Sequence, residues 1–391
     1  MSGGVPLPVV NGKDESPKEA KILSIADLEV EGSKKLARLA REFFNSGSTD
    51  QETIRANTTS LNRLLLRSRV LVNVSSCTTK TTLWNHTTSF PLGIAPAGLQ
   101  GMAHPHGELA TSRACTKKAI PMAISSFSNH GVQEIRDAAA SIAGADQVTI
   151  PNAMQLYTMK DQALQLRIIR RAEKAGCRAI FLTSDSPVLG VRYNEWRNDF
   201  RTPEGLSYPN LEASSADIRN ATHDSKFAAF NDDTHSWEKD IPYLRSVTKM
   251  EIWIKGVLCA EDVERAVEAG CDGVIVSNHG GRQLDGVPAT IDALPACVTA
   301  ARGRIRIHID GGFRRGADIF RALALGAEFV WVGRPAIWGL AYDGQAGVEK
   351  MIDLLKEDFR RCMALCGCKS VSDINRSCLA RINADGVLAK L

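Results

Sequence analysis

The sequence has no long apolar run, no block of like charge and few aromatic residues. No window approaches the roughly 18 consecutive apolar residues that a membrane-spanning helix needs. Lysine and arginine total 48 against 44 aspartate and glutamate residues, and the two signs are mixed along the chain. Because no basic segment is interleaved with aromatic residues, which make up 6% of the chain, nucleic acid is not an expected partner. The polar N-terminal residues also lack the apolar core of a secretory signal.

The ten cysteines are scattered and show no framework of paired spacings. We expect reduced thiols in an intracellular protein, since disulfides form mainly in secreted chains. Cys362, Cys366 and Cys368 form a cluster, but it lacks a second pair of ligands and lies in a helical pattern that ends at Gly367. Buried thiols explain this cluster better than a metal site, so no metal is predicted.

From residue 91 onward, short apolar segments alternate with helical ones. The apolar segments mostly start at intervals of roughly 20 to 35 residues, the length of one strand–loop–helix–loop unit. The predicted strands are Leu92–Ala97, Met122–Ser126, Ala153–Tyr157, Ala179–Asp185, Ile252–Gly256, Gly273–Ser277, Ile307–Gly311 and Phe329–Gly333. Eight such parallel units close a barrel, so the predicted fold class is α/β with a (β/α)8 TIM barrel.

Two helical segments repeat one another and support this interpretation. Residues 262–270 and 318–326 both carry apolar residues at positions i, i+3 and i+4 and both end in glycine. This pattern is typical of an outer helix that packs on a barrel and is terminated by glycine.

We expect one domain over residues 22–391, preceded by a flexible arm of residues 1–21. Residues 22–90 are predicted to form an N-terminal helical cap, with short helices broken at Gly47 and a small hairpin at 75–86. Residues 91–370 are the barrel and 371–391 a C-terminal tail. The interval after the fourth strand is long, and residues 203–240 within it show no strong period, which predicts an inserted substrate loop or, alternatively, surface decoration.

The segment Ser277–Gly286 directly follows the sixth predicted strand and carries both an imidazole and a guanidinium. His279 can accept a proton near neutral pH, and Arg282 can hold a carboxylate with two hydrogen bonds. This combination suits a small acid that loses a proton. The alternative is that His279 satisfies a loop hydrogen bond and Arg282 faces solvent, but so glycine-rich a loop is costly for structure alone.

Polar and small residues also follow the other strands, at the barrel end where active sites lie. They are Pro96, Ala97, Gly98, Ser125, Gln155, Tyr157, Thr183, Asp185, Lys255, Ser277, Asp310, Gly311, Gly312, Arg314, Gly333 and Arg334. Any one of them can be a satisfied core residue, but together they predict a site. The glycines and arginines after the seventh and eighth strands predict a phosphate site. Asp310 would meet sugar-like hydroxyls, and Lys255 would stabilise a reduced, anionic ring.

Several runs resemble the FMN-dependent 2-hydroxy acid oxidase and dehydrogenase family, to which glycolate oxidase belongs. These runs are Pro91–Pro96, Gly101–Pro105, Ser277–Asp285, Asp310–Gly312 with Arg314–Gly316, and Ala324–Ala327 followed by Gly333–Pro335. The similarity extends from about Ile22 to Ser377, and the histidine run is highly specific.

The resemblance implies a role for each matched residue. His279 would remove a substrate proton, with Asp185 stabilising the charged imidazole, and Tyr157 would hydrogen-bond near the reacting oxygen. Arg282 and Arg192 would hold the substrate carboxylate. FMN would be the cofactor, with its ring lined by residues 96–98, Ser125, Gln155, Thr183 and Lys255. Its ribityl chain and phosphate would meet Asp310, Arg314, Gly333 and Arg334.

Three positions depart from the family pattern. Phe43 stands where the family usually has a tyrosine whose hydroxyl helps to hold the carboxylate. Gly98 replaces a frequent alanine, which predicts about a methyl group of extra room, and Phe127 replaces a frequent tryptophan in the pocket wall. Together these departures predict a substrate that is bulkier than glycolate or whose carboxylate is bound differently.

The expected reaction is oxidation of an L-2-hydroxy acid to the 2-oxo acid, with O2 as acceptor and hydrogen peroxide as product. The alternatives are a dehydrogenase that uses another acceptor, a tailoring oxidoreductase that acts on a different metabolite, and a flavin-binding barrel without turnover. The resemblance implies a homotetramer. The final residues Ala389-Lys390-Leu391 resemble a peroxisomal import tripeptide, which predicts a peroxisomal location and otherwise a cytoplasmic one.

Overall fold

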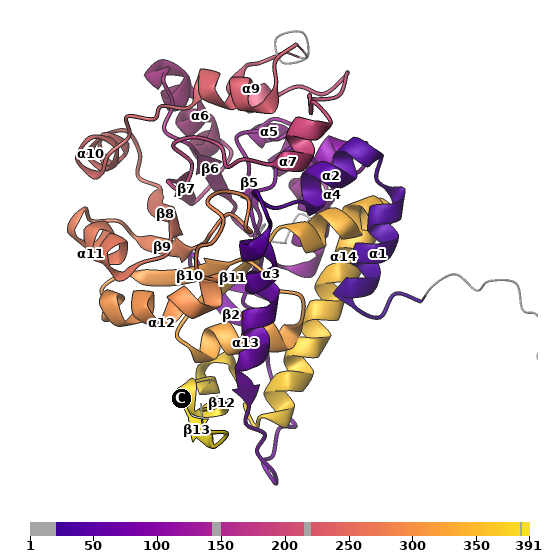
Figure 1. Ribbon diagram of the computed structural model, residues 1–391, viewed down its shortest axis with the longest axis vertical. Coiled ribbons are helices and arrows are strands. Elements are labelled where there is room, and N and C mark those ends of the chain that lie inside the picture. The colour runs from indigo at the N-terminus through magenta and orange to yellow at the C-terminus, as the bar shows by residue number, and fades with distance from the viewer. Residues whose placement is uncertain (1–20, 143–149, 215–219, 384) are drawn as a thin grey trace, which may run out of the picture.

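The computed structural model describes residues 21–142, 150–214, 220–383 and 385–391, and the predicted arm lies outside them except for Lys21 (Figure 1). Eight parallel strands form one sheet, in the order β4-β11-β10-β9-β8-β7-β6-β5. A parallel bridge between Ile94 and Met122 joins the two edges and closes the barrel. The strands are β4 (Leu92–Ile94), β5 (Ala123–Ile124), β6 (Ala153–Leu156), β7 (Ala179–Thr183), β8 (Glu251–Val257), β9 (Gly273–Val276), β10 (Arg306–Asp310) and β11 (Phe329–Val332). The predicted fold class and all eight predicted strands are confirmed.

The strands form where apolar residues run without alternation. Every residue of β6, β7, β9 and β11 is buried, because one face of each strand fills the barrel and the other packs against helices. The strands end one to three residues earlier than most of the predicted ones, where the polar residues of the barrel mouth begin. The site residues therefore lie on loops that these strands position.

Helices surround the barrel and supply its outer layer. They are α4 (Gly107–Lys118), α5 (Val132–Ala140), α6 (Gln162–Lys174), α10 (Trp237–Val247), α11 (Ala260–Glu268), α12 (Thr290–Ala301), α13 (Gly316–Ala324) and α14 (Arg334–Leu365). The two repeated segments correspond to α11 and α13, as predicted. Helices α10, α11 and α12 lie along one flank, and α14 lies along the opposite flank beside α1 (Ile25–Lys35) (Figure 1).

The cap contains the expected short helices, α1, α2 (Arg38–Asn45) and α3 (Glu52–Thr59). The hairpin is displaced from its predicted place at 75–86, because its strands are β2 (Thr81–Leu83) and β3 (His86–Thr88). The turn between them consists of Trp84 and Asn85, which adopt left-handed φ angles of 49° and 62°. Glycine usually occupies such turn positions, and this turn has none. The prediction therefore relied on the threonine-rich run and placed the centre of the hairpin wrongly.

The tail joins the cap in a small sheet. Strand β12 (Leu379–Ile382) pairs antiparallel with β1 (Leu65–Leu66) on one side and with β13 (Leu388–Lys390) on the other. The sheet lies at the end of the molecule away from α9 (Figure 1).

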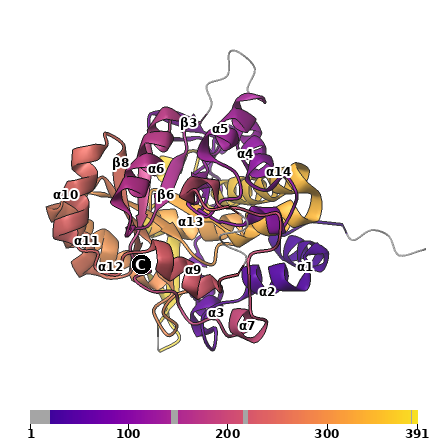
Figure 2. The same ribbon diagram turned by 90° about the horizontal axis from the view of Figure 1, so that it is seen from above.

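The predicted insertion after the fourth strand lies between β7 and β8. Its residues 203–240 are not all loop, contrary to the prediction, because they contain helix α9 (His223–Phe230) and the start of α10. Helix α9 buries only Phe227 and Lys226, so its sequence shows no apolar period. Thr222 caps its first turn by accepting a hydrogen bond from the backbone of Ser225. Seen from above, α9 lies beside α2 and α7 (Tyr193–Arg197) (Figure 2).

Inside the barrel, indole rings face glycines on neighbouring strands. Trp253 on β8 is in register with Gly273 on β9, and Trp331 on β11 is in register with Gly93 on β4. A Cβ atom at Gly273 would lie 2.2 Å from the Trp253 ring, and one at Gly93 would lie 2.4 Å from the Trp331 ring. Each pair is therefore one closely packed unit, in which the missing side chain makes room for the ring.

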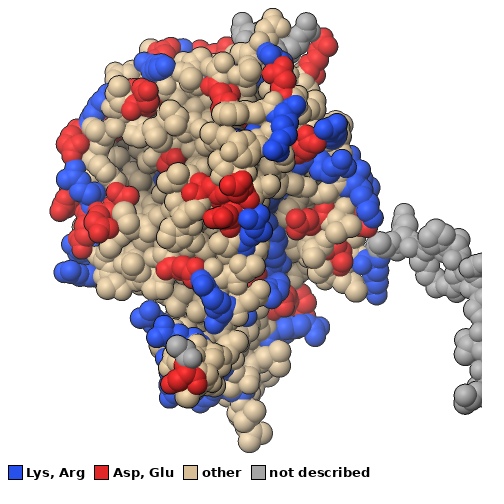
Figure 3. Space-filling view, in the orientation of Figure 1, with Lys and Arg blue, Asp and Glu red and all other residues tan. Residues whose placement is uncertain are grey.

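The distribution of charged side chains on the surface agrees with the small net charge of +4 of the sequence. Lysine and arginine side chains are interspersed with aspartate and glutamate over the face shown in Figure 3. Among the described helices, none is both long and apolar enough to cross a bilayer.

Candidate functional site

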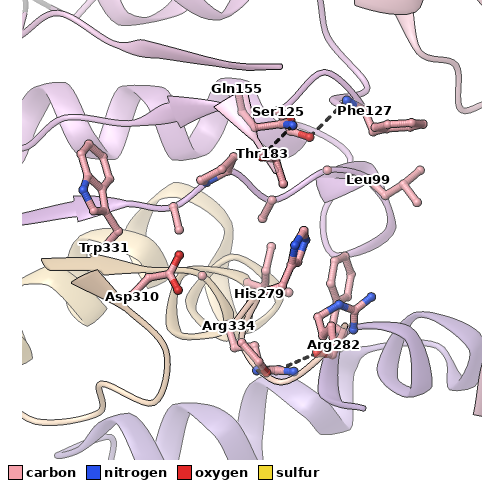
Figure 4. Close-up of a pocket in the computed structure, with 18 of the residues that line it drawn as sticks. Leu99, Ser125, Phe127, Gln155, Thr183, His279, Arg282, Asp310, Trp331 and Arg334 are labelled. Atoms are coloured by element: carbon pink, nitrogen blue, oxygen red, sulfur yellow. Dashed lines mark hydrogen bonds between the residues drawn. The ribbon is translucent and has the colours of Figure 1, made fainter. Parts of the chain in front are cut away.

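A pocket lies at the C-terminal ends of the barrel strands (Figure 4). The predicted site residues that line it are Pro96, Ala97, Gly98, Ser125, Gln155, Tyr157, Thr183, Arg192, Lys255, His279, Arg282, Asp310, Gly311, Gly312, Arg314, Gly333 and Arg334. Two predicted residues lie behind its wall and contact lining residues. Asp185 is hydrogen-bonded to His279, and Ser277 accepts a hydrogen bond from Lys255. The structure thus brings the whole predicted set into one place.

His279 has a strained backbone. Its φ angle of 58° is left-handed, as are those of Gly280 and Gly281, and this conformation costs a non-glycine residue roughly 1–2 kcal/mol. The same loop is held to the cap, because the carbonyl of Gly281 accepts a hydrogen bond from the backbone of Ser48. Such strain is retained where the surroundings fix the conformation, and it is frequent at active sites.

The His279 imidazole is paired with the largely buried carboxylate of Asp185. Nδ1 of His279 lies 3.0 Å from Oδ1 of Asp185. Burial by itself would raise the pKa of Asp185. The charges of His279 and Lys255 act in the opposite direction, and the pKa is lowered to about 2. Burial lowers the pKa of His279 below its usual value, and Asp185 offsets part of this effect. An ionised Asp185 accepts the Nδ1 proton, which leaves Nε2 of a neutral His279 free to act as a base.

Two arginines beside His279 share one carboxylate. Nη1 of Arg192 lies 3.2 Å, and Nη2 of Arg282 3.4 Å, from Oε1 of Glu195. Burial and the neighbouring Arg192 lower the pKa of Arg282 to about 9. Two guanidinium groups against one carboxylate leave a net positive charge, which favours binding of an anion.

Glu195 was not predicted from the sequence. It lies three residues after Arg192, at the spacing that places two side chains on one helix face, and this was the available signal. Arg282 is also anchored to the cap, because Nη1 donates to the carbonyls of Phe43 and Ser46 at 2.6 and 3.1 Å. Its guanidinium lies 4.9 Å from the centre of the Phe43 ring.

The inner wall carries polar groups from several strand ends. Nζ of Lys255 donates to Oγ of Ser277 at 3.1 Å and lies 3.6 Å from Oδ2 of Asp310. Nε2 of Gln155 donates to Oγ1 of Thr183 at 3.2 Å. Oδ1 of Asp310 is buried and has no hydrogen-bond partner among the described residues. Buried polar atoms are seldom left unpaired, so this oxygen fits a ligand that donates a hydrogen bond.

Two half-buried arginines lie near the ends of β10 and β11. Burial lowers the pKa of Arg314, and it lowers that of Arg334 strongly, with Arg282 and Arg314 adding to the effect. Neither guanidinium forms a salt bridge with a carboxylate of the described residues. Gly311 and Gly312 adopt φ angles of 97° and 88°. Positive charge that no carboxylate of the described residues meets in a salt bridge, beside such glycines, fits a phosphate group.

Arg334 does more than the sequence predicted. Its guanidinium donates to the carbonyls of Phe44, Gly280 and Ser46 at 2.9, 2.9 and 3.0 Å, and so joins the cap to the His279 loop. Arg314 uses one donor on the carbonyl of Phe313 and lies 4.7 Å from the Trp338 ring. Arg314 therefore has more donors available for a ligand than Arg334.

The extra room predicted at Gly98 is not there. A Cβ atom at this position would lie 2.7 Å from the carbonyl oxygen of Phe127 and 3.0 Å from its Cβ. The Phe127 backbone therefore occupies the space that an alanine methyl would need. The glycine permits a close approach between two loops, and it does not enlarge the pocket.

A buried acid supports these two loops. Oε1 of Glu108 accepts hydrogen bonds from the backbone N–H groups of Gln100 and Asn129, both at 3.2 Å. Glu108 is completely buried, Oε2 has no partner among the described residues, and burial raises its pKa to about 7. The sequence gave no sign of this role.

We expect Glu108→Gln to stabilise the protein at alkaline pH. When folding raises the pKa of a carboxyl group, the folded state favours the protonated form of that group. The wild type therefore loses folding stability as the pH rises from about 4.5, the usual pKa, to about 7, the pKa in the folded protein. Glutamine stays neutral, so the free energy of unfolding of the variant should exceed that of the wild type by up to about 3 kcal/mol at pH 8. Urea unfolding at pH 5 and pH 8 measures this. If the free energies of unfolding of the variant and the wild type differ by the same amount at both pH values, the prediction is wrong.

Comparison with known proteins agrees with this geometry. Residues 32–381 match the protein family described as FMN-dependent dehydrogenase. The chain is 42% identical to Oxidase FUB9 of Fusarium oxysporum f. sp. lycopersici over 388 residues, 98% of each chain. It is also 42% identical to Glycolate oxidase 3 of Arabidopsis thaliana over 361 residues, which cover 91% of this chain and 95% of that one. The crystal structure of mandelate oxidase with (S)-4-hydroxymandelic acid has a TM-score of 0.84 at 36% identity, covering 92% and 98% of the two chains.

Proposed function

Because the chain belongs to the FMN-dependent dehydrogenase family and is an FMN-dependent 2-hydroxy acid oxidoreductase acting on a CH–OH group, we propose an L-2-hydroxy acid bulkier than glycolate as its substrate. We further propose that O2 is the electron acceptor, so that the 2-hydroxy acid and O2 yield the 2-oxo acid and hydrogen peroxide. The observation that carries this proposal is the pairing of the His279–Asp185 couple with Arg192 and Arg282 in one pocket.

The residues present fit the cofactor. The unpartnered Oδ1 of Asp310 suits a ribityl hydroxyl, and the half-buried guanidinium of Arg314 suits the phosphate. Lys255, Gln155 and Thr183 would face the ring, with Ser125 and residues 96–98 completing that wall and Gly311, Gly312, Gly333 and Arg334 completing the phosphate end. Bound FMN supplies the acceptor for the two electrons that leave the substrate.

The protein's own groups would hold the substrate and move its proton. Arg282 and Arg192 would hold the carboxylate, and Nε2 of His279 would take the proton from the substrate. Asp185 would stabilise the resulting imidazolium, since it is ionised at neutral pH. Burial raises the pKa of Tyr157, so its hydroxyl stays protonated and can donate a hydrogen bond to the reacting oxygen.

The aromatic wall of the pocket supports a bulky, apolar substituent on the substrate. Phe127 and Phe227 both line the pocket, with their rings stacked at 6.3 Å, and Tyr157 meets Phe227 edge-on at 5.1 Å. Such a wall favours an aromatic or branched side chain over the single hydrogen of glycolate. The similarity to a mandelate oxidase structure supports the same proposal.

A panel of hydroxy acids tests the proposal. Purified protein is mixed without oxygen with glycolate, L-lactate, L-2-hydroxy-octanoate and (S)-mandelate, and bleaching of the flavin absorbance is followed. We expect the bulky acids to bleach the flavin at least tenfold faster than glycolate, and admitted air to restore the colour with release of hydrogen peroxide. No bleaching by any acid would exclude the substrate class, and reduced flavin that persists in air would favour the dehydrogenase alternative.

The assembly and the domain division are also proposed. We propose one domain from residue 22 to 391, with a cap (22–90), a barrel (91–370) and a tail (371–391), assembled as a homotetramer. Sedimentation of the holoprotein tests the tetramer.

We also propose a peroxisomal location, which Ala389-Lys390-Leu391 supports. A fluorescent protein fused to the N-terminus should enter peroxisomes, and removal of Leu391 should keep it in the cytosol.

A further inference from the structure

Helix α9 brings a second imidazole to the pocket. His223, the first residue of α9, lines the pocket and also a neighbouring cavity that contains Glu195, Trp196 and Asp224. Its side chain is 15% exposed, so one edge of the ring can be reached by a ligand. It is a polar group on a wall that is otherwise largely aromatic, and the reaction proposed above does not use it.

The ring of His223 is fixed on two sides. Nδ1 lies 2.6 Å from Oε2 of Glu195, a short, charge-assisted contact. The ring centre lies 5.5 Å from that of Phe43 and 5.9 Å from that of Phe200, and these two phenylalanines stack on each other at 4.6 Å. His223 is therefore held in one orientation before any ligand binds, which lowers the entropy cost of a contact with it.

Glu195 connects His223 to the two arginines that would hold the substrate. Its other oxygen, Oε1, meets Arg192 and Arg282. The second imidazole thus stands at the same corner as both guanidinium groups. Since Glu195 occupies Nδ1, and Nε2 has no hydrogen-bond partner among the described residues, Nε2 is the atom that remains for a ligand.

We propose that His223 is a specificity-determining residue, whose Nε2 donates a hydrogen bond to the substrate carboxylate and which takes up a proton when that anion binds. The inference rests on the proposed function. Nδ1–H donates to Glu195, so Nε2 carries a hydrogen only in the imidazolium form. The carboxylate therefore binds together with a proton from solvent, and no bond other than N–H is made.

The surrounding charges agree with this coupling. Burial lowers the pKa of His223, Glu195 partly offsets this, and the charges of Arg192 and Arg282 lower it further. The next residue, Asp224, is hydrogen-bonded to the indole of Trp196. A carboxylate bound between the two arginines neutralises the groups that oppose protonation of His223, and the pKa of His223 rises on binding.

Phe43 offers a matched internal control. Its ring contacts both Arg282 and His223 but cannot form a hydrogen bond, whereas Phe43→Tyr would add a hydroxyl at the same corner. If the role of His223 is to donate to the anion, a tyrosine hydroxyl should replace it without any proton uptake. If His223 only supports the packing of α9, the hydroxyl cannot compensate for its loss.

The test uses holoenzyme and the 2-oxo acid product of the best hydroxy acid in the panel, which has no hydrogen at C2 to lose. Titration calorimetry at pH 7.5, in buffers of different ionisation heat, gives both the dissociation constant and the number of protons taken up. His279 is present in every variant, so differences between variants report on residue 223. We expect His223→Phe to weaken binding about tenfold and to lower the proton uptake, since phenylalanine cannot donate the hydrogen bond to the charged carboxylate.

The Phe43→Tyr/His223→Phe double variant should recover most of the affinity but not the proton uptake. His223→Gln, which keeps hydrogen-bonding capacity without titrating, should lose the uptake and retain part of the affinity. Unchanged affinity or unchanged uptake in both single variants of His223, or no recovery in the double variant, would overturn the inference. Failure of every hydroxy acid to bleach the wild-type flavin would instead overturn the proposed function.

Discussion

Replacing His279 with alanine is expected to slow anaerobic reduction of the bound flavin by about a hundredfold or more, because a general base contributes at least that factor. Nε2 of His279 is available to take the proton, since Nδ1 is engaged by Asp185 at 3.0 Å. Stopped-flow absorbance with the best hydroxy acid measures the rate. Affinity for the 2-oxo acid should change far less, because the two arginines remain.

The backbone at position 279 calls for a second variant. Its φ angle of 58° is tolerated better by asparagine than by alanine, so His279→Asn tests the base with less risk to the loop. Because burial lowers the pKa of His279, the wild-type rate should rise with pH in a range below the usual pKa of an imidazole and then level off. Near-normal reduction in both variants, with the same pH profile, would remove His279 from the proposed mechanism.

Replacing Arg314 with leucine is expected to raise the dissociation constant for FMN about a hundredfold or more. Loss of one partner of a buried ion pair costs roughly 3–5 kcal/mol, and Arg314 has no carboxylate partner among the described residues. Leucine keeps apolar contact with Trp338, which lies under the guanidinium. Fluorescence titration of the apoprotein with FMN gives the constant.

Riboflavin, which lacks the phosphate, provides the control. The wild type should bind FMN much more tightly than riboflavin, whereas Arg314→Leu should bind the two with similar affinity. A variant that still prefers FMN by the wild-type factor would show that the phosphate is held elsewhere. Arg334 is a poorer test, because its three hydrogen bonds to backbone carbonyls join the cap to the His279 loop.

The barrel could be predicted from the sequence because its signal is local. Each buried strand is a short apolar run that ends in polar or glycine residues, as Gly273–Val276 does before Ser277. Strand-end residues that lie far apart in the chain meet once the barrel closes, so most of the predicted pocket residues followed from the strand list. Arg192 did not, and only the resemblance to the family pointed to it. The hairpin centre was wrong because its turn uses Trp84 and Asn85 in a conformation that glycine usually marks.

What could not be predicted depends on tertiary packing. Glu195 and His223 become site residues only because α7 and α9 fold over the pocket, and the sequence of α9 shows no apolar period. The absence of room at Gly98 depends on where the Phe127 carbonyl lies, and the raised pKa of Glu108 depends on its complete burial. Apart from the three-residue spacing between Arg192 and Glu195, none of these facts leaves a local pattern in the chain.

The indole–glycine pairs inside the barrel restrict which substitutions the chain can accept during evolution. A larger residue in place of Gly273 collides with Trp253, and a smaller one in place of Trp253 leaves a cavity, so either change alone destabilises the barrel. The wall residues on α2 and α9 have no such partner inside the barrel. We therefore expect lineages descended from this chain to retain both pairs while the residues that choose the substrate diverge.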